Sequence, residues 1–165
     1  DELQRIRRTP YQFYREAANE LAARMLALVI PRTPTGRYPA ESGKVGGTLK
    51  RGWVSKSQRQ AEANAEKKPD PVEMRAWAYS LPVRHKGNTY EITVSNPVEY
   101  ASYVEYGHRQ QPGRYVPAIG KRLKANWVEG QYMMTISENK LRSIEPQVLE
   151  NLLHRWLKEV FDNGK

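Results

Sequence analysis

The chain has 165 residues, enough for one domain with its own hydrophobic core and too few for two domains of ordinary size. It contains no cysteine, which excludes disulfides and cysteine-ligated metal sites, and no run of about 18 apolar residues, which excludes a membrane-spanning helix. The formal net charge of +9 favours a polyanionic neighbour, and the hydrophobic fraction of 39% predicts extended loops that bury little surface.

The first predicted element is a long amphipathic helix that begins at Thr9. Threonine is a favoured N-cap, and Pro10 suits the first helical position, where no backbone N–H is needed. Apolar residues then recur at spacings of four and three and define one face of the helix: Tyr14, Ala18, Leu21, Met25 and Leu28. Pro31 and Pro34 are expected to end the helix, because neither can continue its hydrogen-bond ladder.

Residues 31–47 are rich in proline and glycine and are predicted to form an extended basic loop. Charge is concentrated here, since residues 31–59 contain seven basic side chains and a single acid, Glu41. This concentration indicates either a polyanionic neighbour or a solvated loop that promotes solubility. Gly36 and Arg37 form either a turn with a docking arginine or part of a flexible loop. The residues expected to face DNA or a lumen are Lys44, Lys50, Arg51 and Lys56.

The segment after this loop mixes a short helical signal with irregular sequence. Residues 48–53 favour one helical turn, which is expected to lead into a strand over residues 53–57. Residues 58–71 combine alanine, charge and proline without periodicity. We therefore expect an exposed arm over residues 58–71, with one or two helical turns as the alternative.

A β-hairpin is predicted next, over residues 76–85 and 89–95. Its second strand alternates apolar with polar side chains, as a half-buried strand does, and a turn containing glycine and asparagine separates the two strands. Asn96, with the proline that follows it, then forms an N-cap and N1 pair that opens a short tyrosine-rich helix running to Tyr106. Gly107 fits the left-handed position that ends helices.

The last third of the chain is predicted to be a loop followed by helices. A loop rich in proline and glycine spans residues 108–117, and the chain is expected to be helical from Trp127 onward, with one segment at 131–142. A final helix begins at Glu145 and carries an apolar stripe. These elements predict a single α+β domain over residues 1–165, in which a long N-terminal helix and C-terminal helices pack on a small antiparallel sheet, with extended loops.

Three sequence pieces occur in a distinctive order: PTGR at residues 34–37, TLKRGW at 48–53 and NPVEYASYVEYG at 96–107. This order resembles the siphophage minor tail component family, which comprises tail-completion and head–tail joining proteins. The last piece is the most specific, because six positions agree in register: Asn96, Tyr100, Ala101, Tyr103, Glu105 and Gly107. Residues 38–46 depart from the family pattern and look like an insertion. An added basic loop of this kind is a candidate for a phage-specific contact.

The resemblance implies a role as well as a fold. It implies a small α+β protein without catalytic activity or cofactor, which forms a ring, expected to be hexameric, in the neck or at the tail end of the virion. The ring would complete the tail and join it to the head connector or portal side, so that DNA can pass. Its partners would be further copies of the chain, the tail tube or tail terminator protein, and the connector. Assembly would take place in the host cytoplasm.

Candidate contact residues cluster around the short tyrosine-rich helix. Tyr103 and Tyr106 can fill the core or meet a neighbouring subunit, since tyrosine suits both places. Glu105 is either solvated or paired with an arginine such as Arg109. An acid–base role for His108 with Arg109 is disfavoured, because no nucleophile or carboxylate constellation surrounds them, and an exposed loop tip is expected instead. The candidate interface or docking residues are Gly36, Arg37, Tyr103, Glu105, Tyr106, His108 and Arg109.

Two rival functions are weighed against the structural one. A sequence-independent nucleic-acid-binding protein could use residues 31–59 without forming a ring, and its affinity would fall steeply with salt. An enzyme would need clustered carboxylates or a histidine pair, whereas the acids are scattered and the three histidines lie far apart in sequence. The sequence therefore favours a structural protein with no catalytic residues, metal, cofactor or membrane contact.

Overall fold

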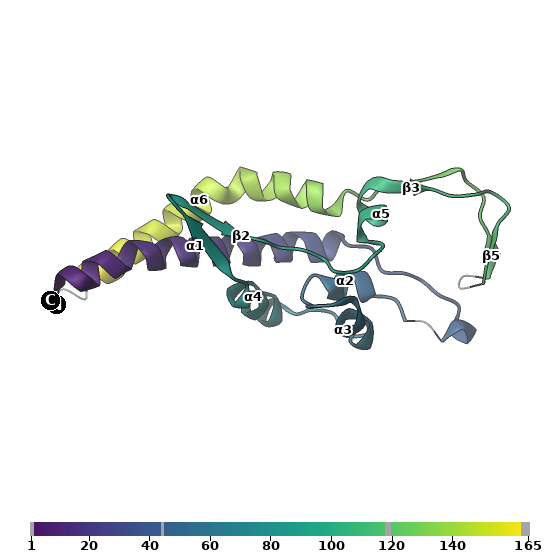
Figure 1. Cartoon of the computed structure of the whole chain (residues 1–165), viewed down its shortest axis with the longest axis horizontal. Coiled ribbons are helices and arrows are strands. Elements are labelled where there is room, and N and C mark those ends of the chain that lie inside the picture. The colour runs from purple at the N-terminus through teal and green to yellow at the C-terminus, as the bar shows by residue number, and fades with distance from the viewer. Residues whose placement is uncertain (1, 44, 118–119, 163–165) are drawn as a thin grey trace.

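Two long helices give the molecule an elongated shape. The computed structural model describes residues 2–43, 45–117 and 120–162 of the chain (Figure 1). Helix α1 (Glu2–Arg32) and helix α6 (Met133–Asp162) lie side by side along the long axis. The start of α1 and the end of α6 share one end of this axis, and loops and small strand pairs occupy the other end (Figure 1). Segments far apart in sequence are thereby brought to the same end of the molecule.

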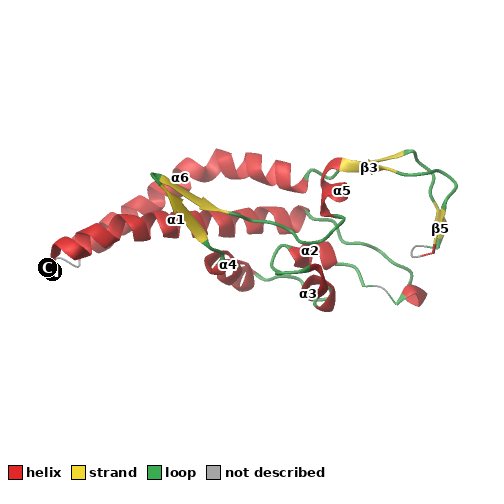
Figure 2. Cartoon of the chain, in the orientation of Figure 1, coloured by secondary structure: helices red, strands yellow, loops and turns green. Residues whose placement is uncertain are grey.

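The shorter elements come between these two helices in the sequence, and Figure 2 shows α2, α3 and α4 below α1 and the strands β3 and β5 beyond the helix ends. In chain order they are η1 (Ala40–Ser42), α2 (Thr48–Gly52), α3 (Gln58–Ala63), α4 (Pro71–Ser80), β1 (Val83–Lys86), β2 (Thr89–Ile92), α5 (Ala101–Tyr106), β3 (Gly107–Arg109), β4 (Tyr115–Val116), β5 (Lys121–Arg122) and β6 (Trp127–Glu129). Among the described residues, the strands form three antiparallel pairs: β1 with β2, β3 with β6, and β4 with β5. The α+β class and the long N-terminal helix are confirmed.

The main core lies where the second half of α1 meets α2, α4 and the start of α6. Leu26, Val29 and Ile30 of α1 are fully buried there, against residues that include Leu49, Ala78, Val98 and Met133. The indole N–H of Trp53 donates to the hydroxyl of Thr33 at 2.8 Å, and this hydroxyl donates to the carbonyl of Val29 at 2.8 Å. The buried polar groups at the end of α1 are therefore paired, as burial requires.

A second, smaller core joins the outer halves of α1 and α6. Ala17 of α1 is buried against Val148 and Leu152 of α6. Phe13 contacts Trp156 with ring centroids 5.4 Å apart, which extends the contact towards the helix ends. Of the predicted apolar face of α1, Ala18 and Met25 are buried, but the fully buried core residues Leu26, Val29 and Ile30 lie outside it. Tyr14 is 50% exposed and stacks on Tyr90 of the hairpin.

Both long helices run through a proline that was predicted to begin a helix. Helix α1 starts at Glu2 rather than Thr9 and runs through Pro10, but it ends at Arg32, between Pro31 and Pro34, so its predicted end is confirmed. Helix α6 is one helix rather than two, and Pro146 lies in its interior. A proline in a helix interior costs about 3 kcal/mol. Burial of α6 residues against α1 on the far side of Pro146 and at Met133 opposes that cost, so the helix continues.

The structure changes the expected elements between residues 48 and 80. The helical turn is confirmed as α2, but residues 53–57 form a turn rather than a strand, buried at residues 53–55 and exposed at Lys56 and Ser57. Residues 58–71, expected as an exposed arm, contain α3, which matches the helical alternative. The side chain of Ser57 caps α3 by accepting the N–H of Gln60 at 3.3 Å, and Ala61 is fully buried. Burial of this one alanine anchors an otherwise polar helix.

The predicted β-hairpin is confirmed, with a shorter first strand. Helix α4 occupies residues 71–80, and Asp70 caps it by accepting the N–H of Glu73 at 2.8 Å. The first strand therefore begins only at Val83, and a turn with Gly87 at φ +59 joins β1 to β2. Asp70 as N-cap and Pro71 at the first helical position together mark the start of α4. The sequence analysis did not identify this helix start.

Asn96 does not cap the tyrosine-rich helix, which begins only at Ala101. Its side-chain amide instead donates to the carbonyl of Leu49 at 2.8 Å, and its oxygen accepts the N–H of Val98 at 3.2 Å. Gly52 permits this approach, because a Cβ there would lie 2.2 Å from the Asn96 oxygen. Asn96 thus ties the segment before α5 to α2.

Candidate interaction surface

At the end of the molecule far from the α1 start, α5, the β3–β6 pair and the start of α6 meet through backbone contacts. In β3–β6, Gly107 lies opposite Glu129. A Cβ on Gly107 would lie 2.4 Å from the carbonyl oxygen of Val128, and one on Gly130 would lie 2.3 Å from that of Glu105. Gly107 has φ +82 and ψ 172, so its positive φ was predicted correctly, but it starts a strand and is not left-handed helical. Two glycines therefore let three elements close onto one another.

Glu105 is the buried centre of this junction, with 5% of its surface exposed. Its carboxylate accepts the backbone N–H of Met134 at 2.8 Å, and both the backbone N–H and the hydroxyl of Thr135 at 2.9 and 2.7 Å. These N–H groups are free donors of the first turn of α6, where a negative charge is stabilised by the helix dipole. Glu105 is thus neither solvated nor paired with Arg109, and it serves as a remote cap of α6.

The tyrosines of α5 lie on the surface of the chain. Tyr103 is 58% exposed and Tyr106 is 62% exposed, while Val104 and Ala101 of the same helix pack against the main core. Of the two alternatives for Tyr103 and Tyr106, filling the core is therefore wrong. The face of α5 that points to the core carries short apolar side chains. These are long enough to reach the core, because the hydrogen bonds of Glu105 already hold α5 close to α6. The exposed rings leave apolar area for a neighbouring molecule.

His108 and Arg109 form strand β3 rather than an exposed loop tip. His108 is half-buried opposite Val128, and its ring lies 5.7 Å from that of Tyr103. Among the described residues, its Nδ1 atom has no hydrogen-bond partner. Arg109 is exposed opposite Trp127, which belongs to strand β6 and not to a helix. His108 and Arg109 are held by pairing with β6, a strand that lies about twenty positions later in the chain.

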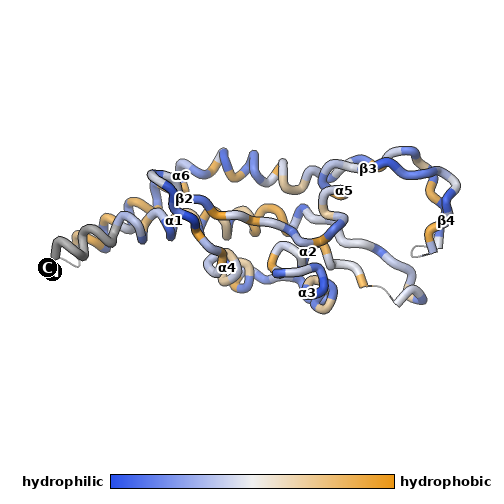
Figure 3. The backbone as a smooth tube through the Cα atoms, viewed as in Figure 1, coloured by the Kyte–Doolittle hydropathy of each residue, from blue (hydrophilic) through white to orange (hydrophobic). Residues whose placement is uncertain are grey.

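The described residues of segment 107–129, which are 107–117 and 120–129, form a two-stranded arm that the sequence analysis did not predict. Strands β3 and β6 make its base, and β4 and β5 continue it outward (Figure 1). Between the pairs, the N–H of Gln110 donates to Asn126 at 2.9 Å, and that of Gly113 to Leu123 at 2.8 Å. Figure 3 shows hydrophilic residues along much of this arm. Glycines at both bends were the available sequence signal.

The seven basic residues of segment 31–59 differ in exposure. Arg32, Arg37, Lys56 and Arg59 are exposed and Lys50 is half-buried, whereas Lys44 lies outside the described residues. Arg51 is 9% exposed, and its Nη1 donates to a carboxylate oxygen of Glu73 at 2.7 Å while Nη2 donates to the other. Arg51 is therefore committed to an internal ion pair instead of facing DNA or a lumen, since leaving a buried guanidinium unpaired would be costly.

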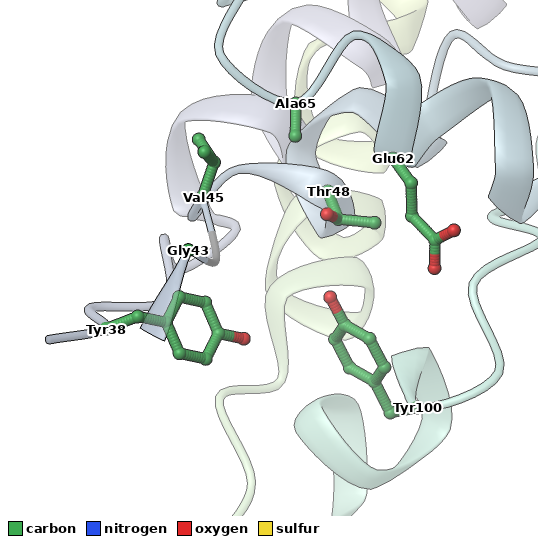
Figure 4. Close-up of a pocket in the computed structure, with 7 residues that line it drawn as sticks. All are labelled: Tyr38, Gly43, Val45, Thr48, Glu62, Ala65 and Tyr100. Carbon is green, nitrogen blue, oxygen red and sulfur yellow. The ribbon is translucent and has the colours of Figure 1, made fainter. Parts of the chain in front are cut away.

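The loop before α2 encloses a surface hollow of about 410 Å³ with α3 and α5. Figure 4 shows Tyr38 and Tyr100 on opposite sides of this hollow, with the hydroxyl of Tyr100 turned toward Thr48 and the carboxylate of Glu62 at one edge. Burial raises the pKa of Tyr100 above the ordinary value of 10.0. Gly36 is exposed, and a Cβ there would lie 3.0 Å from the ring of Tyr38, so this loop position favours glycine.

The described ranges were also compared with what metal sites and membrane spans require. Among residues 2–43, 45–117 and 120–162, no three histidine or acidic side chains are grouped to hold a metal ion. In the same ranges, no helix combines the length and apolar character needed to cross a membrane. The surface around α5 thus offers aromatic rings, exposed cations and a small hollow, which are groups suited to contact with another macromolecule.

A chain with these features, elongated and with exposed rings and a projecting arm at one end, offers surface for contact with other macromolecules. Residues 2–107 match the family described as "Bacteriophage HK97-gp10, putative tail-component". The chain belongs to this family, and it is a structural component of a phage tail and thus of the virion. No curated protein and no solved structure matches it.

The family match confirms the resemblance that the sequence analysis identified, and it shows which part of the chain the family model covers. The match starts within α1 and ends at Gly107, the first residue of β3. It covers the loop, the small helices, the hairpin and α5. The arm beyond Gly107 and the whole of α6 lie outside the match. Any role of the arm must therefore be argued from its own residues.

Proposed function

We propose that this tail component forms a ring, expected to be hexameric, in the neck or at the tail end of the virion. The ring completes the tail and joins it to the head connector or portal-side protein, and DNA passes through its lumen. Its other neighbours are the tail tube or the tail terminator protein, and it assembles in the host cytoplasm before it enters the virion. No chemical step is assigned to it.

The observation that carries this proposal is the pair of exposed tyrosines on a rigid helix. Tyr103 and Tyr106 keep 58% and 62% of their surface free, although α5 is fixed to α6 by the buried carboxylate of Glu105. Large aromatic side chains held on a rigid element lose little conformational entropy on binding, so they are effective contact residues. A closed ring needs two unlike surfaces on each subunit. The α5 tyrosines supply one, and Arg37 with the hollow beside it supplies a candidate for the other.

The proposal is tested by particle mass. The purified chain, alone and mixed with its tail-tube neighbour, should form a closed oligomer in at least one of the two samples. The double variant Tyr103→Ser, Tyr106→Ser should assemble at least roughly tenfold less well, because hot-spot aromatics each contribute 2 kcal/mol or more to an interface. Its free energy of unfolding should change by less than about 0.5 kcal/mol per residue, since both side chains are exposed.

A matched control removes equally exposed apolar surface elsewhere. Val72 on α4 is 79% exposed and Phe161 near the end of α6 is 72% exposed. The double variant Val72→Ser, Phe161→Ser should assemble like the parent chain. A chain that stays monomeric in both samples would contradict the ring, and equal losses in the two double variants would remove the α5 tyrosines from the interface.

The rival function, nucleic-acid binding through residues 31–59, is weakened by the position of Arg51. That side chain is occupied by Glu73, and Lys50 is half-buried, which leaves Arg32, Arg37, Lys56 and Arg59 as the exposed cations in the described part of residues 31–59. These four cations are divided between the end of α1, the loop after it, the turn before α3 and α3 itself, and each phosphate that they neutralise adds only one increment to the affinity for a polyanion. Residues 31–59 are therefore not the strongest basic feature of the molecule.

A further inference from the structure

The strongest basic feature is the arm of residues 107–129. From Tyr106 to Val128 the chain has no acidic residue and five basic ones: Arg109, Arg114, Lys121, Arg122 and Lys124. All five are exposed. Such a run of unopposed cations creates a positive potential along one projecting element, and it favours an anionic partner.

The arm stands apart from the body of the molecule. Beyond its base, every hydrogen bond of its described residues stays within the arm, including that from the Arg122 guanidinium to the carbonyl of Gly113 at 2.8 Å. An isolated two-stranded hairpin is only marginally stable in water. A cationic hairpin whose described outer residues hydrogen-bond only within the hairpin therefore fits an element that becomes fully ordered on a partner.

The shape of the arm fits duplex nucleic acid. A two-stranded ribbon is narrow enough to enter the major groove of B-form DNA or to lie along its backbone. Arg109 lies opposite Trp127, and Arg122 lies opposite Tyr115, so a cation and an aromatic ring share a face at both strand pairs. Arginine and lysine at this spacing can contact successive phosphates, whose density along the duplex is high.

A second copy of the chain is a less suitable partner for the arm. Residues 107–129 contain five of the 27 basic side chains and one of the 18 acidic ones, so the rest of the chain has 22 basic against 17 acidic residues. A basic arm would thus meet a body that is itself net positive. Arg37, in the loop before α2, is a further exposed cation of the body.

We propose that the arm of residues 107–129 binds the phosphate backbone of duplex DNA without sequence preference. Arg109, Arg114, Lys121 and Lys124 make the contacts, while Arg122 also holds the bend at Gly113. The identification of this DNA as the genome passing through the tail rests on the function proposed above. Binding itself depends only on the arm, so it does not require ring formation.

The test measures binding of the whole protein to a short labelled DNA duplex by fluorescence anisotropy. The triple variant Arg114→Gln, Lys121→Gln, Lys124→Gln should bind at least roughly tenfold more weakly at about 50 mM salt, and its slope of log K against log salt should be smaller by about 2.7, because three phosphate contacts are lost. The control triple Lys68→Gln, Lys140→Gln, Lys158→Gln changes the net charge equally at exposed positions outside the arm. It should keep the affinity and slope of the parent chain.

The outcomes separate this inference from the ring. Two duplexes of different base composition should bind with equal affinity, since only the backbone is contacted. Absence of binding at low salt, or equal losses in both triple variants, would overturn the inference, while particle mass in the absence of DNA would still report the ring. Arm-dependent self-association without DNA binding would also overturn it, and would assign the arm to a second copy.

Discussion

The carboxylate of Glu105 accepts both the backbone N–H and the side-chain hydroxyl of Thr135, at 2.9 and 2.7 Å. These residues are 30 positions apart, and the whole arm lies between them. The contact therefore closes the base of the arm at the point where α5 meets α6. Glu105, which lies inside the family match, thus caps helix α6, which lies outside it.

Removal of this carboxylate should destabilise the protein. In Glu105→Ala the N–H groups of Met134 and Thr135 lose a buried charged acceptor, for which we expect a loss of about 2–3 kcal/mol in the free energy of unfolding. Glu105→Gln keeps one acceptor oxygen and should lose about 1 kcal/mol. Urea denaturation measures both values. The control Glu138→Ala removes an exposed carboxylate from the same helix and should change stability by less than about 0.5 kcal/mol. A loss in Glu105→Ala as small as in the control would contradict the capping role.

Arg51 should contribute to stability and not to contact with DNA. Arg51→Ala leaves the carboxylate of Glu73 without its bidentate partner, and we expect a loss of about 2 kcal/mol, below the value for fully buried pairs because Glu73 is 37% exposed. Arg51→Lys should recover only part of it, since an ammonium group cannot make both contacts at once.

The matched control for this pair is Arg142→Ala, because Arg142 is 72% exposed and pairs with Glu138 on the surface. Its effect should stay below about 0.5 kcal/mol by urea denaturation. In the DNA-binding measurement, Arg51→Ala at a temperature where it is folded should bind like the parent chain. A strong loss of DNA affinity with unchanged stability would return Arg51 to the DNA-facing residues.

Sequence reasoning succeeded where the deciding interactions are local. The α+β class, α2, the hairpin turn at Gly87 and the positive φ of Gly107 depend on residues within a few positions of one another. The candidate contact residues Tyr103, Tyr106 and Arg109 are exposed, as contact residues must be, although their partners are still a prediction. Periodicity and turn chemistry are sufficient for such features.

Sequence reasoning failed where distant residues decide the structure. Asn96 looked like an N-cap, but its amide binds the carbonyl of Leu49, which is 47 positions away. Glu105 looked like a solvated helix residue, but its partners belong to α6. Pro10 and Pro146 looked like helix starts, whereas packing between α1 and α6 keeps both helices continuous through them. Local propensity is a weak guide when tertiary contacts compete with it.

Two glycines of the arm should respond differently to the same substitution. Gly107 and Gly113 have nearly equal positive φ values of +82 and +83, but only Gly107 is crowded, because a Cβ there would lie 2.4 Å from the carbonyl oxygen of Val128. Gly113→Ala should lose about 1 kcal/mol of unfolding free energy from backbone strain alone. Gly107→Ala should lose at least about 3 kcal/mol, since a backbone oxygen cannot move aside without breaking the β3–β6 pair.

Hydrogen exchange measured in parallel locates these losses. In Gly107→Ala the amide of Gln110, which is bonded to Asn126, should lose protection together with the start of α6. In Gly113→Ala only the outer bend should lose it. Equal destabilisation of the two variants would show that the crowding at Gly107 is relieved at little cost.

Stability should fall at alkaline pH through two tyrosines. Burial raises the pKa of Tyr100 and of Tyr79 above the ordinary value of 10.0, against a smaller lowering at Tyr79 from Arg75. The raised folded-state pKa means that each tyrosine contributes stability fully below pH 10, and that this contribution is lost as pH rises through the folded-state pKa. The free energy of unfolding, measured by urea at about pH 9 and about pH 11, should therefore decrease. In Tyr79→Phe and Tyr100→Phe this decrease should be smaller than in the parent chain, whereas the control Tyr106→Phe, at a 62% exposed site, should retain it in full. An identical decrease in all three variants would place the alkaline sensitivity elsewhere in the molecule.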